Sequence, residues 1–406
     1  GGECFVELAR EKAQRSHLIV TNHSLLAIDA IEGVPMIPDY DCVVIDEAHE
    51  LTARVTQAAT DELSVADVER AARRAQRHVE GDEADDLDDA AGALASAIEA
   101  SSPGRFDLVP EQLADALVLV RDAARACVSA FPKESGDEAD AGRTQARGMA
   151  QDVFVTAERM AAHVEADVLW LSEGGERMPP RLHVAPLEVR GPMRDKLLHD
   201  KTVVFTSATL RLGGDFAAVA ASLGLKPDEQ VSDSPGVSTE SDTDRVAWRG
   251  VDVGSPFDYG KQAILYVAKH LPAPGRDGLG EAQLDEIAQL VDAAEGRTLG
   301  LFSSRRAAES AAVGIRERLP HLTTLAQGEA QLPELARQFV GDPHTCLFGT
   351  LSLWQGLDVP GETCQLVIID RIPFPRPDDP LMSARQRATD RAGGNGFMQV
   401  AATHAA

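Results

Sequence analysis

The stretch CVVIDEAHEL at residues 42–51 places a run of apolar residues directly before two adjacent carboxylates. Val43, Val44 and Ile45 are typical of a buried strand, and Asp46 and Glu47 follow at once. Burying a charge is costly without a partner, and neighbouring carboxylates repel each other. The pattern therefore predicts a strand whose end faces a cation or a reacting water.

Ligands of open α/β sheets bind at the carboxyl ends of the strands. We therefore interpret the stretch as a magnesium–nucleotide site, in which Asp46 holds Mg²⁺ through water and Glu47 orients or deprotonates the attacking water. The alternative is a strand that ends in a solvated acidic turn. The whole string V-V-I-D-E-A-H is much rarer than two adjacent acidic residues, and it favours the nucleotide site.

The composition is that of a soluble globular protein with two to three domains. The chain has 406 residues, of which 44% are hydrophobic and 26% are charged. No apolar run reaches the ~20 residues of a membrane span, and no signal peptide opens the chain, so we expect no membrane association. The five cysteines form no C-x-x-C pair, which favours a reducing cytoplasm over a disulfide framework.

The net charge of −26, from 65 acidic and 39 basic residues, argues against a surface that coats nucleic acid generally. A DNA motor needs only a local basic track, so that class of protein stays open. Much of the acid lies in EGDEADDLDDA at residues 80–90, which we interpret as a solvated loop.

Hydrophobic periodicity predicts an α/β part that is interrupted by a helical block. The elements expected in the first part are a helix at 1–17, a buried strand at 18–26 that runs into a polar turn, and buried strands at 42–46 and 201–210. Residues 52–185 are rich in Ala, Arg and Glu and show few strand signals, which predicts a helical insertion with helices near 66–80 and 111–131. The polar segment 226–244 is a candidate linker.

Strands alternate with helices in the remainder of the chain. The expected elements are helices at 281–294, 305–318 and 332–340 and strands at 298–302, 322–326, 345–349 and 365–370. Such alternation is typical of a parallel, doubly wound sheet. The predicted fold class is therefore α/β, with two parallel sheets and a helical insertion in the first.

The strand-end motifs, taken in order, resemble the DinG/XPD-type superfamily-2 DNA helicases, and most closely the bacterial DinG proteins. The motifs are T-N-H-S-L-L (21–26), D-E-A-H (46–49), F-T-S-A-T-L (205–210), S-P-F-D-Y (255–259), L-F-S-S-R-R (301–306), F-G-T-L-S-L-W-Q-G-L-D-V-P-G (348–361) and I-D-R-I-P-F-P-R-P-D-D-P-L (369–381). The resemblance covers almost the whole chain and is weakest in the helical block. It implies two incomplete RecA-like domains, one at 1–51 and 186–235 and one at 236–406, with an arch-like insertion at 52–185.

The resemblance implies roles for residues of the first domain. Asp46 and Glu47 would be the magnesium and hydrolysis carboxylates, and His49 would couple the ATP site to the neighbouring helicase motif. Taken alone, His49 is equally well explained as a hydrogen-bonded histidine at the edge of the core.

Other residues of the first domain would connect hydrolysis to DNA. The resemblance implies this linking role for Thr206, Ser207 and Thr209, whose alternative is a turn of hydroxyl residues at a strand end. Asn22 and His23 would lie near the DNA path, and their alternative is polar helix capping.

In the second domain, Ser304 and Arg305 would grip a DNA phosphate, and Thr350 and Ser352 would offer hydroxyls to the DNA backbone. Trp354 is expected either to stack on a base or to pack in the core.

The same motif implies two contacts with the nucleotide cleft. Gly356 would allow a close approach, and Asp358 would face the cleft. Family members often carry Glu where this chain has Gln355, so no charge is expected there.

The resemblance implies an ATP-driven motor that uses Mg²⁺. ATP would bind between the two RecA-like domains, and single-stranded or forked DNA would lie across both of them. Translocation would run 5′ to 3′ in DNA repair or replication, and the insertion would help to form the passage for the strand. We expect a cytoplasmic monomer.

Three family elements are missing or partial. The loop G-x-x-x-x-G-K-[ST], which holds a triphosphate, does not occur in the sequence. The nearest string is GSPFDYGKQ at 254–262. We reject it because it has five residues between its glycines and ends in Gln262. The arginine element Q-x-x-G-R-x-x-R should begin near 399–406, where the chain stops. Cys4 resembles the last of four cysteines that hold a [4Fe–4S] cluster in many members, but one thiolate cannot hold it, and the alternative is an inert helix cysteine.

We therefore interpret the chain as a helicase fragment, cut at both ends, that does not hydrolyse ATP alone. One alternative is a catalytically inactive paralogue that binds DNA or a protein partner. Another is a GTPase or other nucleotide enzyme with D-E-A-H by chance, which the T-S-A-T and W-Q-G-L-D-V-P-G strings make improbable.

Overall fold

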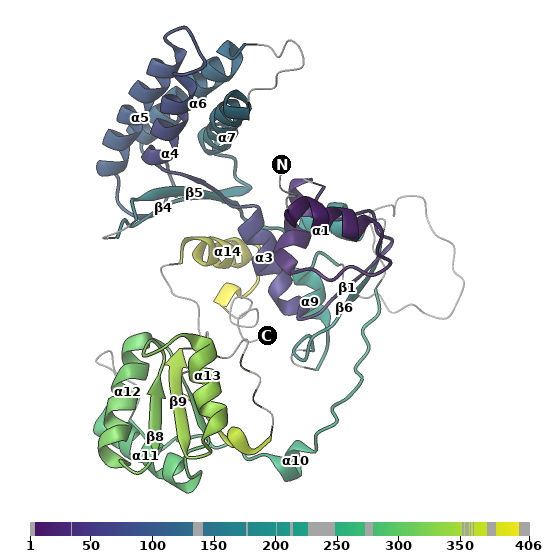
Figure 1. Ribbon diagram of the computed structural model, residues 1–406, viewed down its shortest axis with the longest axis vertical. Coiled ribbons are helices and arrows are strands. Elements are labelled where there is room, and N and C mark those ends of the chain that lie inside the picture. The colour runs from purple at the N-terminus through teal and green to yellow at the C-terminus, as the bar shows by residue number, and fades with distance from the viewer. Residues whose placement is uncertain are drawn as a thin grey trace. The chain divides into compact units, whose positions relative to one another are not determined.

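Two units make up the chain in the computed structural model (Figure 1). The first comprises residues 1–252 and 375–406, and the second comprises residues 253–374. The structure describes residues 5–33, 35–132, 141–175, 178–199, 201–211, 214–225, 248–272, 279–350, 353, 357, 359, 361–371 and 379–397. The expected boundary between the two RecA-like domains, at 235/236, and the candidate linker lie outside these residues.

The first unit contains a parallel pair of strands, both of which were expected. β1 (Cys42–Ile45) pairs with β6 (Thr202–Phe205), with Ile45 opposite Phe205. Ile45 is buried in an apolar cluster shared with the surrounding helices, whereas Val44 is 64% exposed. The helical elements of this part are α1 (Phe5–Gln14), α2 (His23–Ala27), η1 (Ile28–Glu32), η2 (Ala48–Glu50), α3 (Leu51–Ala58), α8 (Arg190–Met193), η3 (Arg194–Leu198) and α9 (Ala217–Ser222).

The strand expected at residues 18–26 is wrong. No strand forms there, and α2 begins directly after Asn22, whose Oδ1 accepts a hydrogen bond from the Leu25 N–H at 2.8 Å. Leu18 and Val20 are 82% and 89% exposed, so these apolar side chains do not belong to a core. The Asn22 cap, and not the apolar content of the segment, is the local signal that agrees with the observed helix.

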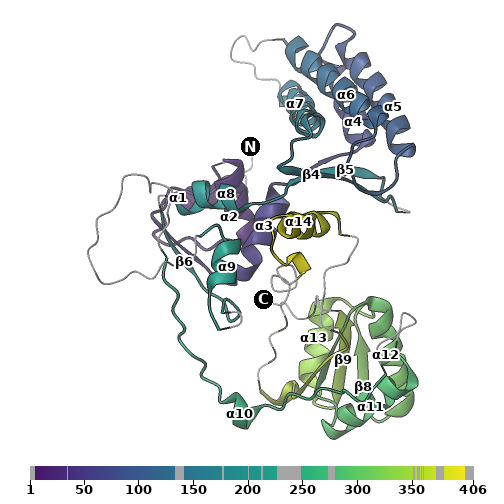
Figure 2. The same ribbon diagram turned by 180° about the vertical axis from the view of Figure 1, so that it is seen from behind.

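The insertion combines helices with an antiparallel sheet. Its strands lie in the order β2-β5-β4-β3, and α4 to α7 lie on one side of the sheet in both Figure 1 and Figure 2. Leu169, Leu182 and Val184 of the sheet share a buried core with these helices. The elements are β2 (Asp61–Leu63), α4 (Val65–Ala75), α5 (Glu83–Glu99), β3 (Gly104–Arg105), α6 (Glu111–Ala130), α7 (Ala141–Ala162), β4 (Asp167–Ser172) and β5 (Arg181–Pro186).

The helical character of the insertion was expected, with helices near 66–80 and 111–131 that correspond to α4 and α6, but its sheet was not. In β4, Val168, Leu169 and Leu171 are buried and Trp170 is partly exposed, so the strand shows no clean period-two pattern, and it is short beside the long Ala-rich helices. The acidic tract at 80–90, expected as a solvated loop, instead runs into α5 from Glu83 onward. Leu87 is fully buried within the tract, and carboxylates in the first turn interact favourably with the helix dipole.

The second unit is an α/β domain with a parallel sheet in the order β10-β7-β9-β8. α11 and α12 pack on one face of the sheet through Val291 and Ile315, and α13 packs on the other through Phe339. Gly300 at the centre of β7 leaves room for the Phe348 ring, which a Cβ would overlap. The elements are α10 (Tyr259–Gln262), α11 (Glu281–Ala293), β7 (Thr298–Phe302), α12 (Arg305–Arg318), β8 (Thr323–Ala326), α13 (Leu332–Gly341), β9 (Thr345–Thr350), η5 (Gly361–Thr363) and β10 (Leu366–Ile369). The strands and helices expected from periodicity at 281–370 are confirmed.

α14 (Pro380–Arg391) follows the second unit in the sequence but groups with the first, although we expected it in the domain at 236–406. The helix contacts β3 and β4 of the insertion. Arg385 Nε donates a hydrogen bond to Leu187 O at 2.8 Å, and Arg385 Nη2 donates to Thr56 Oγ1 at 2.9 Å. Burial lowers the pKa of this guanidinium. Among the described residues, no helix is both long enough and apolar enough to cross a membrane.

Candidate active site

Two sequence motifs meet at the carboxyl edge of the β1–β6 pair. Because the strands are parallel, the D-E-A-H residues after β1 and the T-S-A-T residues after β6 leave the sheet at the same edge. The Thr206 N–H donates to Ile45 O at 2.9 Å, and the Ala48 N–H donates to Thr206 O at 3.0 Å. Strand pairing therefore continues past both strands and holds the two motifs side by side.

Glu47 has a left-handed backbone, with φ 49° and ψ 46°. An L-residue adopts this conformation at a cost of about 1–2 kcal/mol, because its Cβ approaches the following carbonyl oxygen. The Glu50 N–H donates to Glu47 O at 3.0 Å and closes the turn, while Ala48 is buried beneath it. The turn leaves the Glu47 carboxylate 61% exposed at the edge of the sheet. Strained backbone of this kind clusters at functional sites.

The Ser207 hydroxyl joins the two motifs. It donates to Glu47 Oε2 at 3.1 Å, and since a hydroxyl has one proton, the His49 ring 2.9 Å away acts as a donor through its Nδ1–H. The Thr209 N–H also donates to Ser207 Oγ, at 3.3 Å. Residues that were predicted from two separate motifs thus form one hydrogen-bonded group.

Asn22 and His23 belong to the same region, but their contacts are with the protein. Asn22 caps α2, which is the alternative that its sequence left open. His23 Nε2 lies 2.7 Å from Asp46 O, and because a carbonyl only accepts, the ring carries its proton on Nε2. His23 therefore supports the main chain of the D-E-A-H turn.

The exposed Asp46 carboxylate suits a hydrated magnesium ion. Mg²⁺ usually keeps several waters and takes one or two carboxylates together with substrate phosphates. Within the described ranges, no group of three His, Cys, Asp or Glu side chains could hold a metal ion by itself. Asp46 and Glu47 therefore fit magnesium together with a nucleotide, in which the phosphates supply the missing ligands.

The cysteines do not fit an iron–sulfur cluster in the part of the chain that the structure describes. Cys4, the candidate ligand, lies outside it. The described cysteines Cys42, Cys127, Cys346 and Cys364 are free. Burial raises the pKa of Cys127 to about 11 and that of Cys346 to about 12, which opposes the thiolate form that binds iron.

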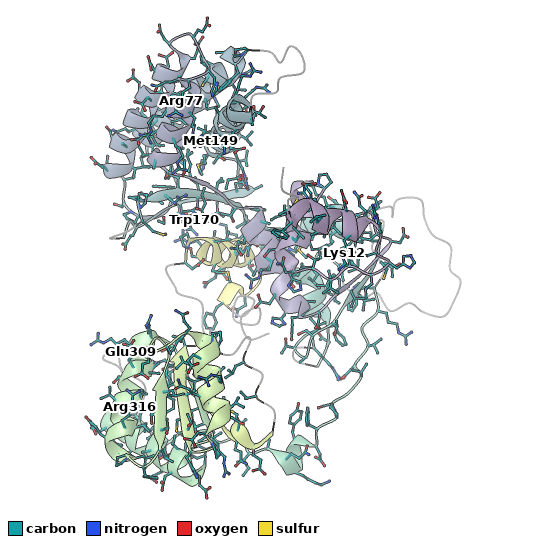
Figure 3. All side chains as sticks on the ribbon, viewed as in Figure 1. Lys12, Arg77, Met149, Trp170, Glu309 and Arg316 are labelled. Atoms are coloured by element: carbon teal, nitrogen blue, oxygen red, sulfur yellow. The ribbon has the colours of Figure 1, made fainter. Side chains whose placement is uncertain are left out.

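Ser304 and Arg305 lie at the carboxyl edge of the second sheet, where β7 leads into α12. Ser304 Oγ accepts the Ala307 N–H at 3.2 Å and caps the helix. Arg305 Nε donates to Glu309 Oε1 at 3.1 Å, and both side chains are more than half exposed. Figure 3 labels Glu309 on α12. An exposed ion pair contributes little stability. Arg305 is therefore accessible to an anion that replaces Glu309.

Two side chains at this edge were missed as site residues. Gln327 follows β8, and its Oε1 accepts the N–H and the hydroxyl of Thr350 at 2.8 Å and 3.0 Å. Asp370 follows β10, and its carboxylate accepts the N–H and the hydroxyl of Ser303 at 2.9 Å and 3.0 Å. Burial raises the pKa of Asp370. A carboxylate directly after a buried strand is the signal that identified Asp46, and it would have identified Asp370, whereas no such signal marks Gln327.

Four predicted residues of the longest motif lie outside the described residues. Ser352 and Trp354 were predicted to contact DNA, and Gly356 and Asp358 were predicted to face the nucleotide cleft. These four assignments stay predictions. Leu353, which the structure does describe, is fully buried in the apolar cluster on the α13 side of the sheet.

Several known proteins are similar to this chain. A family model described as the helicase C-terminal domain matches residues 287–406. The ATP-dependent helicase DinG of Mycobacterium tuberculosis is 47% identical over 415 residues, which cover 100% of this chain and 60% of that protein. The ATP-dependent DNA helicase YoaA of Escherichia coli is 28% identical over 420 residues, covering 98% of this chain and 62% of that protein. A solved structure of Xpd4 from S. tokodaii has a TM-score of 0.48 and 12% identity, over 94% of this chain and 72% of that one.

Proposed function

Because the chain belongs to the DinG/XPD-type superfamily-2 helicases, we propose that it supplies much of the motor of an ATP-dependent DNA helicase that translocates 5′ to 3′. The chain spans 60% of the length of the mycobacterial relative. The observation that carries the proposal is the Ser207 hydroxyl, which contacts Glu47 at 3.1 Å and His49 at 2.9 Å. This contact connects the motif expected to act on ATP with the motif expected to respond to DNA.

Glu47 and Asp46 would share the chemistry of hydrolysis. The oxygen of a water attacks the γ-phosphorus, the bond to the β–γ bridging oxygen breaks, and the Glu47 carboxylate takes up the proton of the water. The left-handed turn at Glu47 leaves its side chain 61% exposed at the edge of the sheet. Asp46 would hold Mg²⁺ through water, and the ion would neutralise charge on the phosphate oxygens.

Ser207 would transmit the state of the nucleotide site. A shift of the Glu47 carboxylate during hydrolysis changes the acceptor of the Ser207 hydroxyl. Thr209 is held to Ser207 through its N–H, and His49 is held through its Nδ1–H, so both would move with it. In the proposed motor, this is how hydrolysis in the first unit reaches the DNA-binding residues.

The DNA-binding part of the proposal rests on the exposed edge of the second sheet. Arg305 would exchange its exposed partner Glu309 for a phosphate, with the N-terminus of α12 behind it. Ser352 and Trp354 would extend the contact along a single strand, and Thr350 would contribute through its main chain, because its hydroxyl donates to Gln327. Single-stranded or forked DNA as the partner, a monomeric state and a role in repair or replication are further parts of the proposal.

The test compares ATP hydrolysis by the 406-residue chain with hydrolysis by the product of the whole reading frame that contains it. We expect no turnover from the 406 residues, which contain no P-loop motif, and DNA-stimulated turnover from the longer product. Glu47→Gln should abolish that turnover, whereas Glu50→Gln in the same turn should preserve it. Turnover by the 406 residues would contradict the first expectation. DNA binding without turnover by the longer product would favour the inactive DNA-binding alternative.

A further inference from the structure

The pair Gln327–Gly328 lies between two residues that we expect to contact DNA. It follows β8, which is next to β9 in the sheet and packs against α12. β9 ends at Thr350, and α12 begins at Arg305. Neither Gln327 nor Gly328 belongs to the strand-end motifs that resemble the helicase family.

The amide oxygen of Gln327 binds both donors of Thr350. Oε1 accepts the Thr350 N–H at 2.8 Å and the Thr350 hydroxyl at 3.0 Å, while the Gln327 N–H donates to Phe348 O at 2.8 Å. The amide also lies close to Gly349, where a Cβ would be 2.8 Å from Oε1. The Gln327 side chain thus extends the hydrogen bonding between β8 and β9. It holds the main chain at Thr350, the last residue of β9.

Gly328 provides space for the Arg305 guanidinium. Its φ is +104°, and a Cβ built on it would overlap the guanidinium and lie 2.7 Å from Cζ. Arg305 itself is 63% exposed and is bonded to Glu309. The absence of a side chain at 328 therefore determines where the Arg305 cation rests before it meets an anion.

We propose that Gln327 and Gly328 are positioning residues for DNA binding, an inference that rests on the function proposed above. Gln327 acts through the main chain at Thr350, and Gly328 acts through the guanidinium of Arg305. Because the single hydroxyl proton of Thr350 is directed at Gln327, this hydroxyl is not the donor that a phosphate meets in this arrangement. Thr350 contributes a main chain that Gln327 anchors at the end of β9.

Gln327→Met keeps the length of the side chain and removes the acceptor. We expect it to weaken binding of single-stranded DNA about threefold to tenfold and to speed amide exchange at residue 350 by a similar factor. Gln338→Met, on the exposed side of α13, is the matched control. Thr350→Val removes the hydroxyl that donates to Gln327 and keeps the N–H that donates to the same oxygen, so it should weaken binding less than Gln327→Met. A direct contact between that hydroxyl and a phosphate predicts the opposite order.

Gly328→Ala displaces the Arg305 guanidinium. Loss of one phosphate contact lowers the slope of log affinity against log salt by about 0.7 on a single strand, so Gly328→Ala and Arg305→Ala should lower it alike. Backbone strain alone would lower stability and leave the slope unchanged. Gly393→Ala controls for strain, since Gly393 has φ +82° with no heavy atom within 4 Å of a built Cβ.

Fluorescence anisotropy of a labelled single-stranded oligonucleotide, titrated with the 406-residue chain at several salt concentrations, measures the affinities and salt slopes, and hydrogen exchange measures the protection of the amide at residue 350. If the unsubstituted chain does not bind, the proposed DNA-binding function fails and the positioning roles fall with it. If it binds and both variants match their controls, the function stands and the positioning inference is overturned. Faster exchange at residue 350 with unchanged affinity also overturns it.

Discussion

The Glu47→Gly variant is expected to be more stable than the Glu47→Ala variant, which reverses the usual order of stability for these two residues. The left-handed backbone of Glu47, with φ 49° and ψ 46°, costs alanine about 1–2 kcal/mol and costs glycine almost nothing. Glu47→Gly and Glu47→Ala both delete the carboxylate and its hydrogen bond from Ser207. The difference between the two variants therefore isolates the backbone conformation, and we expect about 1 kcal/mol in favour of glycine.

Glu50 is the matched control in the same turn. Its φ of −76° and ψ of −21° are right-handed, and it also loses an ion pair, with Arg54, when it is truncated. In this conformation alanine is expected to be more stable than glycine by about 0.5–1 kcal/mol. The sign of the difference should thus change between positions 47 and 50.

Local hydrogen exchange is the appropriate assay, because a chain with several units does not unfold in one step. Protection of the amides in residues 42–58 reports the opening free energy of the turn and of the strand and helix beside it. Equal protection in the two variants at position 47, or the same sign at both positions, would refute the reasoning. The expected result would show that the D-E-A-H turn keeps a strained residue where a carboxylate must face one direction, as functional sites often do.

Three further predictions concern stability. Arg159 donates two hydrogen bonds to Asp167, at 3.0 Å and 2.7 Å, so Arg159→Met should destabilise the insertion by about 2–3 kcal/mol. Hydrogen exchange in β4 measures this loss, and Arg121→Met, which removes a surface ion pair with Asp122, should have no measurable effect. Burial raises the pKa of Asp370, so acidification through that pKa toward the ordinary 3.8 should stabilise the second unit relative to Asp370→Asn, and a pH-independent difference in urea midpoint would contradict this. Arg385→Met should speed amide exchange in α14, and unchanged exchange would show that the guanidinium does not anchor the helix.

The second unit could be predicted closely because its central strands, β7 and β9, are buried along almost their whole length. In β7 every residue is buried, so the strand appears in the sequence as an unbroken apolar run between two amphipathic helices. The strands of the insertion are not buried in this way, because one face of their sheet packs on helices. The six residues Asp167–Ser172 show no clean alternation of buried and exposed positions, so they give a weak strand signal beside a long helix.

Local charge misled the prediction of residues 80–90, and local apolarity misled that of residues 18–26. In the first case Leu87 is buried, and the carboxylates lie on the outer face and in the first turn of a helix, where charge is tolerated. In the second case Leu18 and Val20 remain exposed. Both segments depend on the packing partner, which periodicity within the segment does not identify.

The candidate site was predicted where parallel topology alone brings residues together. Asp46 and Ser207 each come after a strand that is an apolar run in the sequence, and parallel pairing is sufficient to place them at one edge. Gln327 shows the limit of this rule, because its role depends on which donors its amide oxygen reaches, Thr350 N–H and Oγ1. A polar residue after a strand is common, and only the geometry distinguishes one that positions a neighbour.

α14 packs against strands that lie more than 200 residues earlier in the sequence. Asp379, whose carboxylate accepts the Met382 N–H at 2.7 Å, and proline at the first helical position are start signals that the sequence contains. The helix nevertheless packs on the insertion, where Arg387 and Arg105 both pair with Asp107 at 2.7 Å. Only residues 370–379 join it to β10 of the second unit. A helix can thus carry clear start signals in its own sequence and still pack on an element that lies far from it in the chain, because those signals do not identify its packing partner.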